Sequence, residues 1–214
     1  MAPGQLFFAL SGPSFDAHAF LAQARVGGAA AADVAHTMSD ALPQIVVPDP
    51  RAALGVLARA WRERFTVPVI AVTGSNGKTT VKEMMASCFA AHASEPGAVL
   101  ATPGNLNNDI GLPLTLFSQG QAHQYVVLEM GANHAGEIAG LAAIASPRIG
   151  IVTQCAPAHL EGFGSLEGVA RAKGELFEAL PADGTAVINA DDPYAALWMA
   201  LSRHTSQMTF GVSV

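Results

Sequence analysis

The sequence predicts an α/β protein built on a doubly wound, mainly parallel sheet. From residue 67 onward, short apolar runs alternate with longer segments whose apolar residues have helical spacing. The runs are apolar nearly throughout, as in strands that are buried on both faces of a parallel sheet. Such alternation of strands and helices is typical of a doubly wound domain. The predicted strands are 67–73, 98–102, 125–129, 149–153, 185–189 and 207–211.

Two stripes of apolar residues predict helices between these strands. One stripe follows the first strand, and the other precedes the strand at 185–189, with Ser165 as its N-cap. The first stripe consists of Val81, Met84, Met85, Cys88 and Phe89, and the second of Leu166, Val169, Ala170, Leu176, Phe177 and Leu180.

Residues 1–65 have a different pattern and predict a small, separate and incomplete α/β domain. Its helices are expected at 17–26, where Asp16 opens the helix, and at 51–65, and its strands at 5–10 and 44–47. The predicted domains are therefore 1–65 and 66–214, with a join near Thr66.

Composition and charge exclude several classes of protein. The chain has 214 residues, a net charge of −6 and no basic tract, which argues against binding to a nucleic acid backbone. No apolar run reaches the roughly 18–20 residues that a membrane helix needs, and the N-terminus lacks the basic region of a signal peptide. Cys88 and Cys155 lack metal-ligand spacing and are expected to be free thiols. These features predict a cytoplasmic protein.

The most specific motif is the turn that follows the first strand. Residues 69–80 combine a buried strand, a glycine-rich turn and the start of a helix. Glycines allow backbone N–H groups to approach a polyphosphate, and a helix N-terminus favours an anion. Lys78 can reach the outer phosphates, and the Thr79 hydroxyl can bind Mg²⁺. The residues expected to contact ATP are Gly74, Ser75, Asn76, Gly77, Lys78, Thr79 and Thr80.

This loop departs from the standard phosphate-loop pattern at one position. The pattern has a glycine five residues before Gly77, where this chain has Val72. The alternative is a glycine turn that caps a helix and leaves Lys78 in solvent. Polar residues at the ends of other predicted strands favour a binding site, because ligands bind beyond the carboxyl ends of parallel strands. These strand-end residues are Glu129, Gln154 and Asn189.

Several segments, in this order along the chain, resemble the Mur ligases, a family of ATP-dependent amide ligases. The turn 73–80 resembles their ATP loop. The loop 11–18 resembles their UDP-side loop, although Ala17 stands where a glycine is common. The segments 102–113, 128–132, 158–164 with 172–175, and 189–193 resemble the family's asparagine-rich loop, metal-binding strand end, second metal site and adenine-side turn, respectively.

Two short strings resemble one branch of this family. Residues 129–134 and 159–164 are similar to the members that add D-alanyl-D-alanine to UDP-N-acetylmuramoyl-tripeptide in peptidoglycan precursor synthesis. Folylpolyglutamate synthases share the fold, but their loop typically has Gly-Ser where this chain has Thr79 and Thr80. In the reaction that the resemblance implies, ATP phosphorylates a substrate carboxylate. An amine then attacks the acyl phosphate, and ADP and phosphate are released.

The resemblance also implies roles for individual residues. Thr79 and Glu129 would hold the first Mg²⁺, and Lys78 would stabilise the transferred phosphoryl group. His159 would belong to a second metal site. Lys173 lies on an apolar stripe, where burial should lower its pKa, and the family's matching lysine is carbamylated by CO₂ and supports the second metal. The remaining candidates are Asn105, Asn107, Asn108 and Asn133 for substrate, and Asn189 and Asp192 for the nucleotide.

Most of these candidates have a structural alternative. Glu129 could pair with a lysine or arginine, and His159 could be a hydrogen-bonded structural residue. Lys173 could extend its ammonium group to water. The loop asparagines could form Asx turns, and Asn133 and His134 could cap the following helix.

Three alternatives to this ligase are a non-catalytic ATP-binding relative, a Mur ligase that adds diaminopimelate or lysine, and another ATP- or GTP-hydrolysing protein. The presence of Glu129, His159 and Lys173 favours a ligase over a non-catalytic relative. A hydrolysing phosphate-loop protein would have an aspartate at the end of a second strand, where this chain has Glu129. Measured against the resembled family, the chain is expected to lack parts at both ends, including the C-terminal ligase domain, and to be inactive by itself.

Overall fold

The computed structural model describes residues 2–158 and 160–212. The chain divides into two compact units, Met1–Leu57 and Ala58–Val214. Helix α2 (Pro50–Arg62) runs from the first unit into the second, and the Asp49 carboxylate caps its N-terminus by accepting from Arg51 N at 2.8 Å. The domain limits drawn from the sequence at 65 and 66 therefore stay a prediction.

The first unit is a three-stranded parallel sheet in the order β1-β4-β5. Its core consists of Ala9, Leu21, Ala24, Ala32, Val34 and Leu42. The predicted strands are confirmed as β1 (Leu6–Phe8) and β5 (Gln44–Val46), but the central strand β4 (Ala31–Val34) was missed. Its pattern is interrupted by Asp33, which is buried in the strand.

The expected helix 17–26 forms as a 3-10 turn η1 (Ala17–Phe20) followed by α1 (Leu21–Val26). Asp16 opens it as predicted, because its carboxylate accepts from His18 N at 3.0 Å. Hydrogen bonds from the His18 side chain and backbone and from Ser11 lower the pKa of Asp16 to about 2. A short hairpin of β2 (Ser11–Gly12) and β3 (Phe15–Asp16) precedes this turn.

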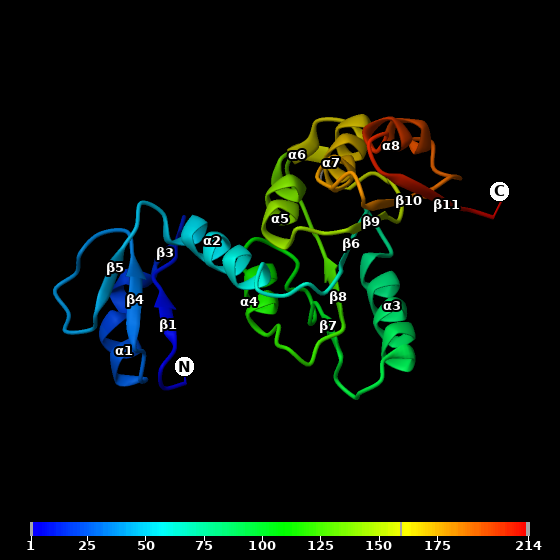
Figure 1. The fold of residues 1–214 in the computed structure, drawn as a ribbon. Coiled ribbons are helices and arrows are strands. Elements are labelled where there is room, and N and C mark those ends of the chain that lie inside the picture. The colour runs from blue at the N-terminus through cyan, green and yellow to red at the C-terminus, as the bar shows by residue number, and fades with distance from the viewer. Residues whose placement is uncertain (1, 159, 213–214) are drawn as a thin grey trace. The chain divides into compact units, whose positions relative to one another are not determined.

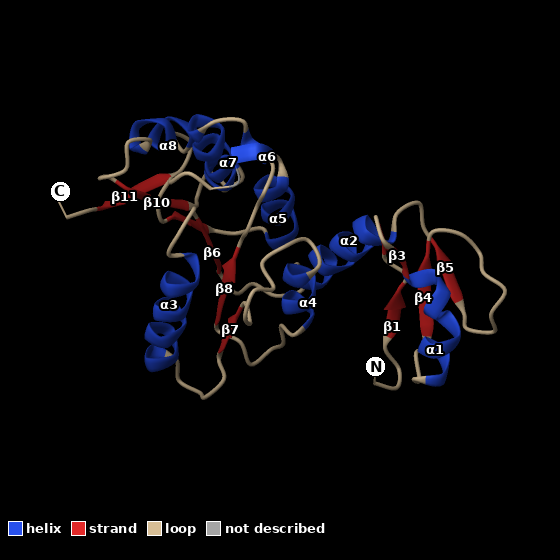
Figure 2. Ribbon diagram, turned by 180° about the vertical axis from the view of Figure 1, so that it is seen from behind, coloured by secondary structure: helices blue, strands red, loops and turns tan. Residues whose placement is uncertain are grey.

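The second unit contains a six-stranded sheet whose neighbouring strands are all parallel, in the order β11-β10-β9-β6-β8-β7. Figures 1 and 2 show its helices on both sides of this sheet. The doubly wound, parallel fold predicted from the sequence is therefore confirmed. The strands are β6 (Val69–Thr73), β7 (Val99–Ala101), β8 (Tyr125–Glu129), β9 (Ile149–Val152), β10 (Thr185–Asn189) and β11 (Ser206–Phe210).

Alternate residues of each strand point to opposite faces, and each face has its own core. On one face, Val69, Ala71 and Leu128 pack with α4 (Gly111–Phe117) and α5 (Glu137–Ala145). The neighbouring part of this face packs with α7 (Leu166–Glu178) and α8 (Ala195–Leu201). On the other face, Ile70 and Val72 pack against α3 (Lys78–His92). Val72, which stands where the standard pattern has a glycine, is a buried residue of β6 and is 0% exposed.

Helices α3 and α7 match the two predicted stripes, and Ser165 caps α7 by accepting from Gly168 N at 3.0 Å. Helices α4, α8 and the short α6 (Leu160–Phe163) were not predicted, and of α5 the sequence predicted only that a helix follows His134, without bounds. Helix α5 is rich in alanine and apolar nearly all round, so it lacks the two-sided pattern by which an amphipathic helix is identified.

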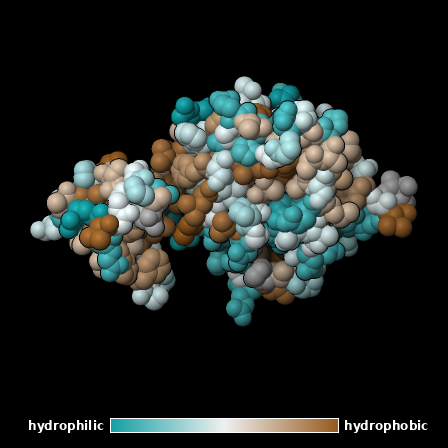
Figure 3. Space-filling view, turned by 90° about the horizontal axis from the view of Figure 1, so that it is seen from below, coloured by the Kyte–Doolittle hydropathy of each residue, from teal (hydrophilic) through white to brown (hydrophobic). Residues whose placement is uncertain are grey.

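The larger unit presents a mixed surface. On the face drawn in Figure 3, hydrophilic and hydrophobic residues are interspersed over this unit. Within residues 2–158 and 160–212, no helix has both the length and the apolar character to cross a membrane.

Packing of α8 on α7 predicts a large loss of stability when Trp198 is shortened. Its ring is 0% exposed, meets Phe177 edge-on at 6.3 Å between ring centroids, and donates to Ala170 O at 2.9 Å. The substitution W198A should lower the free energy of unfolding by about 3–5 kcal/mol, measured by chemical denaturation. The control M208A, on a side chain that is 60% exposed, should change it by less than about 0.5 kcal/mol. Equal effects of the two substitutions would contradict this account of the core.

Candidate active site

The turn between β6 and α3 has the backbone geometry of a phosphate-binding loop. Gly74 has φ 142° and Gly77 has φ 80°, and Gly77 is the N-cap of α3. A Cβ atom on Gly74 would lie 2.0 Å from Thr153 Oγ1. Glycine is therefore required at position 74 for two reasons, the positive φ and the close approach of β9. The loop leads into the N-terminus of α3, which favours an anion.

The segment that follows β9 holds this loop from the side. Ser75 N donates to Gln154 O at 2.9 Å, and Ser75 Oγ donates to Ala156 O at 2.9 Å. Thr153 Oγ1 donates to Asn76 O at 2.6 Å. These bonds fix the loop's backbone before any ligand arrives.

The two lysines of the site lie in different surroundings. Lys78 Nζ donates to Gly74 O at 2.9 Å, so its ammonium group folds back over the loop. Lys173 is only 3% exposed, with its Nζ 5.2 Å from the centre of the Phe163 ring. Burial, and then repulsion by Lys78, lower the pKa of Lys173 to about 8. The alternative in which Lys173 reaches water is therefore wrong, and the burial predicted from the sequence is observed.

Glu129, at the end of β8, is 2% exposed and joins two loops. Its Oε2 accepts from Thr79 Oγ1 at 2.8 Å, and its Oε1 accepts from Asn107 Nδ2 at 2.7 Å. Within the described part of the chain, Glu129 forms no ion pair with lysine or arginine, against the structural alternative. A buried carboxylate beside a hydroxyl is a set of oxygen donors that suits Mg²⁺. The residues at this end of the phosphate loop therefore fit a magnesium ion.

The asparagines of the loop before α4 separate into different roles. Asn107 binds Glu129, whereas the Asn108 carboxamide caps α4 by accepting from Gly111 N at 2.8 Å. Asn105 is exposed, and its backbone O accepts from Asn107 N at 2.8 Å. The Asx-turn alternative therefore describes Asn108, and Asn107 is the asparagine placed in the site.

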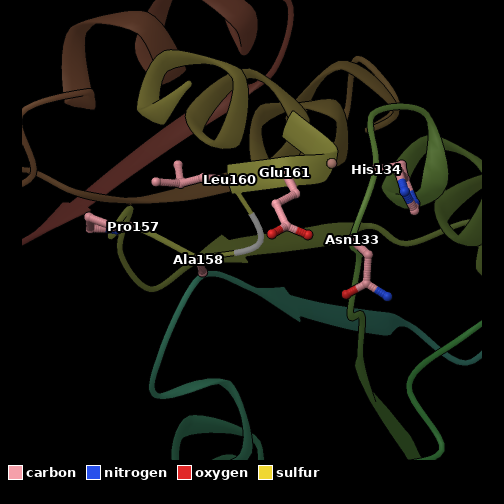
Figure 4. A pocket seen from close by; sticks show the side chains of 7 residues that line it. Asn133, His134, Pro157, Ala158, Leu160 and Glu161 are labelled. Carbon is pink, nitrogen blue, oxygen red and sulfur yellow. The ribbon is translucent and has the colours of Figure 1, made fainter. Parts of the chain in front are cut away.

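The loop between β8 and α5 borders an opening of about 680 Å³. Figure 4 shows Asn133, on the loop after β8, and Glu161, on α6, among the residues that line this opening. His134 Nδ1 instead lies 3.0 Å from Glu137 Oε1, and Asn133 N donates to Glu137 Oε2 at 2.7 Å. Gly162 of α6 allows the two segments to approach, because its Cβ would lie 2.0 Å from Asn133 O.

The residues at the end of β10 are tied to the segment that holds the phosphate loop. Asn189 Nδ2 donates to Thr153 O at 2.9 Å, and Asp192 Oδ2 accepts from Cys155 N at 2.7 Å. These two hydrogen bonds connect the turn after β10 to the segment after β9, and that segment contacts the phosphate loop. Thr80 follows Thr79 in the first turn of α3 and is exposed.

The predicted metal residue His159 lies outside the described residues. Among those that are described, no group of three or more His, Cys, Asp and Glu side chains is placed to hold a metal ion. The candidate donors Thr79, Glu129 and Lys173 include only one side chain of those four types.

Sequence reasoning missed Glu175 and Thr102. The Glu175 carboxylate accepts from Gly136 N at 2.6 Å and Ala139 N at 3.0 Å, and so joins α7 to the start of α5. Thr102 Oγ1 accepts from Glu129 N at 2.9 Å. Both residues lie within segments that resemble the family, 172–175 and 102–113, but nothing in the sequence marks either of them individually.

Comparison with known proteins assigns this chain to a family. The model of the Mur ligase middle domain matches residues 72–213, which include the phosphate loop, Glu129 and Lys173. The chain belongs to the Mur ligase family. The resemblance inferred from the sequence motifs is confirmed.

Sequence and structure comparisons both find similar proteins over nearly the whole of this chain. The UDP-N-acetylmuramoyl-tripeptide–D-alanyl-D-alanine ligase of Escherichia coli K12 is 48% identical over 201 residues, which are 94% of this chain and 44% of that protein. A crystal structure of MurF from Acinetobacter baumannii has a TM-score of 0.93 at 39% identity and covers 98% of this chain and 46% of that one.

A second solved structure, that of MurF from Thermotoga maritima in complex with ADP, has a TM-score of 0.87 at 32% identity. It covers 99% of this chain and 48% of that chain. This Mur ligase chain therefore spans about half the length of the relatives that it matches.

The geometry of the loop predicts that G74A weakens nucleotide binding. An alanine would need a positive φ and would place its Cβ against Thr153 Oγ1. Strain of about 1–3 kcal/mol corresponds to roughly ten- to hundredfold weaker binding of ATP, measured by calorimetry with Mg²⁺. The control G120A has open space around its Cβ and no positive φ, and it should bind as the parent does. Parental affinity in G74A would show that the loop does not hold the phosphates.

The pKa of Lys173 predicts a pH-dependent stability in metal-free, CO₂-free buffer. Because its folded pKa of about 8 lies below the ordinary 10.5, the unfolded chain binds more protons between these values. The free energy of unfolding should therefore rise with pH across this range relative to K173M, by up to about 3 kcal/mol. Below pH 8 the difference in the free energy of unfolding between the parent and K173M should be constant. Denaturation curves measured from pH 7 to 11 that give parallel profiles would show that folding does not lower the pKa of Lys173.

Proposed function

We propose that this chain is the nucleotide-binding part of an ATP-dependent ligase that joins D-alanyl-D-alanine to UDP-N-acetylmuramoyl-tripeptide in peptidoglycan precursor synthesis. The proposal rests mainly on one observation. The Glu129 carboxylate accepts hydrogen bonds from the phosphate-loop Thr79 Oγ1 at 2.8 Å and from Asn107 Nδ2 at 2.7 Å. These oxygen atoms would form a metal site at the end of the phosphate loop. The 48% identity to the Escherichia coli ligase indicates the substrates.

In this proposal the phosphate loop binds ATP through the N–H groups of its turn and of the first turn of α3. Lys78 leaves Gly74 O, its partner in the structure, and moves to the outer phosphates. Thr79 and Glu129 would hold Mg²⁺, which supplies charge stabilisation to the transferred phosphoryl group. Burial of Glu129 strengthens that interaction, since charges interact more strongly away from water.

Lys173 is proposed to act as a carbamate at a second metal site, together with His159. Its lowered pKa makes a neutral amine available near neutral pH, and only the neutral amine reacts with CO₂. Conversion of Lys173 from a cation to an anion would also end its repulsion by Lys78. Ordered carbonyl and aromatic neighbours, Ala132 O and the Phe163 ring, hold the side chain in place.

The remaining candidate residues are proposed to contact the substrate or the nucleotide. Asn133 faces the opening beside α6 and is proposed to contact the substrate. Asn105 and Asn108 retain the same proposed role, although Asn108 also caps α4. Asn189 and Asp192 would lie beside the adenosine portion of the nucleotide, on the segment that supports the phosphate loop.

A cytoplasmic location is part of the proposal. Cys88 and Cys155 are both free thiols, as expected in a reducing compartment. The alternative of a non-catalytic ATP-binding relative is tested by turnover. The alternative of a diaminopimelate- or lysine-adding ligase is tested by exchanging both the UDP-linked peptide and the amine substrate.

The function is tested in two steps. Calorimetry with Mg²⁺ and ATP on this chain should show binding that is lost in K78A, because the substitution removes the cation that reaches the outer phosphates. The exposed control R203A should bind as the parent does.

The protein in its natural full length should then release ADP only when both UDP-N-acetylmuramoyl-tripeptide and D-alanyl-D-alanine are present. ATP binding without this dependence would support the non-catalytic relative. Turnover of UDP-N-acetylmuramoyl-L-alanyl-D-glutamate with diaminopimelate or lysine would support the other ligases.

A further inference from the structure

Helix α3 contains a buried lysine that is separate from the phosphate loop. All residues of α3 are described, and Lys82 is the buried one, with 0% of its surface exposed. Its Nζ donates to Thr102 O at 2.7 Å and pairs with Glu83 Oε1 at 2.7 Å. Lys82 lies one helical turn beyond Lys78, and its ammonium group points at β7 rather than at the nucleotide loop.

Thr102, which accepts a hydrogen bond from Lys82, also takes part in the hydrogen bonds around Glu129. Thr102 is 1% exposed and directly follows β7. Its backbone N donates to Val127 O at 3.0 Å, and its Oγ1 accepts from Glu129 N at 2.9 Å. The bond from Lys82 satisfies the Thr102 carbonyl, so Thr102 contacts α3 and β8 at the same time.

The loop that begins after Thr102 carries Asn107 into the site. Asn107 Nδ2 donates to Glu129 Oε1 at 2.7 Å, and Gly131 N donates to Asn107 O at 2.8 Å. Gly131 lies so close that a Cβ there would be 2.9 Å from Asn107 Oδ1. The position of Thr102 therefore sets where the Asn107 loop starts, and Asn107 with the Thr102 hydroxyl sets where Glu129 lies.

Packing alone does not account for a lysine at this position. Moving an ammonium group out of water is unfavourable, and apolar replacements of buried charges are often neutral or stabilising. Methionine has a similar length and would fill the same space without that cost. What methionine cannot do is donate to the Thr102 carbonyl, which would be left buried and unpaired.

We propose that Lys82 is a positioning residue that, through Thr102 and the Asn107 loop, holds the Glu129 carboxylate in the orientation in which it binds magnesium. The part that concerns magnesium rests on the proposed function of this site. The part that concerns the loop is a property of the protein without ligands.

The ligand-free part is tested by hydrogen exchange on K82M. Amide exchange should accelerate locally at Glu129 and Gly131, whose N–H groups bond to Thr102 and Asn107, and not across the sheet as a whole. The control E83Q removes the ion pair with Glu83 but leaves the bond from Lys82 to Thr102, and its exchange at these amides should match the parent. Unchanged exchange in K82M, or acceleration equal to that of the whole domain, would overturn the proposal.

A second variant distinguishes a local effect at Glu129 from a general loss of stability. The substitution T102V keeps the shape of the side chain but removes the Oγ1 acceptor, so it should accelerate exchange at Glu129 while leaving Lys82 paired. If K82M lowers thermal stability, T102V still shows whether the hydrogen bond from Glu129 N to Thr102 Oγ1 holds Glu129 in place. Slow, parent-like exchange at Glu129 in T102V would contradict the role assigned to Thr102.

The magnesium part is tested by calorimetric titration of Mg²⁺ into the protein saturated with a non-hydrolysable ATP analogue. Loss of a group that orients a metal ligand typically weakens metal affinity by about 10- to 100-fold, and K82M should show a loss of that size. E83Q should retain the parental affinity. Parental Mg²⁺ affinity in K82M would overturn the magnesium part. If the parent binds no analogue at all, the proposed function fails, while the exchange experiment still decides the role of Lys82 in the loop.

Discussion

The site depends on the parallel pairing of β6 with β8 on one side and β9 on the other. Because parallel strands end at the same edge of a sheet, three separate loops open at one place. The β6 turn forms the phosphate loop, β8 ends in Glu129, and the segment after β9 holds Ser75 and Asn76. A shift of one residue in the β6–β8 pairing, in which Val72 lies opposite Glu129, would turn Glu129 to the other face of the sheet and separate it from Thr79.

Charge in this region is arranged for an anionic ligand. Lys78 and Lys173 are close enough that repulsion contributes to the lowered pKa of Lys173. Glu129 forms hydrogen bonds with a hydroxyl and a carboxamide rather than an ion pair with either lysine. Phosphates, or a carbamate on Lys173, would relieve that repulsion. The repulsion between the two lysines therefore favours the chemistry proposed for the site.

Much of this organisation could be predicted from the sequence. The strands of the large sheet are continuous apolar runs, and the phosphate loop depends on local spacing of glycine, lysine and threonine. Elements without a two-sided pattern were missed or left without bounds: β4, which contains Asp33, was missed, and the apolar helix α5 was expected only as a helix after His134. Candidates in the asparagine loop could not be separated, because Asn107 and Asn108 have the same chemistry and differ only in where the backbone points them.

By itself the sequence determined the fold class, the phosphate loop and the family, because each depends on a periodic or local pattern of residue types. Tertiary structure decided which polar residues meet. Thr79, Asn107 and Glu129 are far apart in the chain, and the joining of Lys82 to Thr102 depends on how α3 packs across β7. Hydrogen bonds of this kind act over about 3 Å and require a particular direction. Spacing along the chain does not specify them, and the packed sheet does.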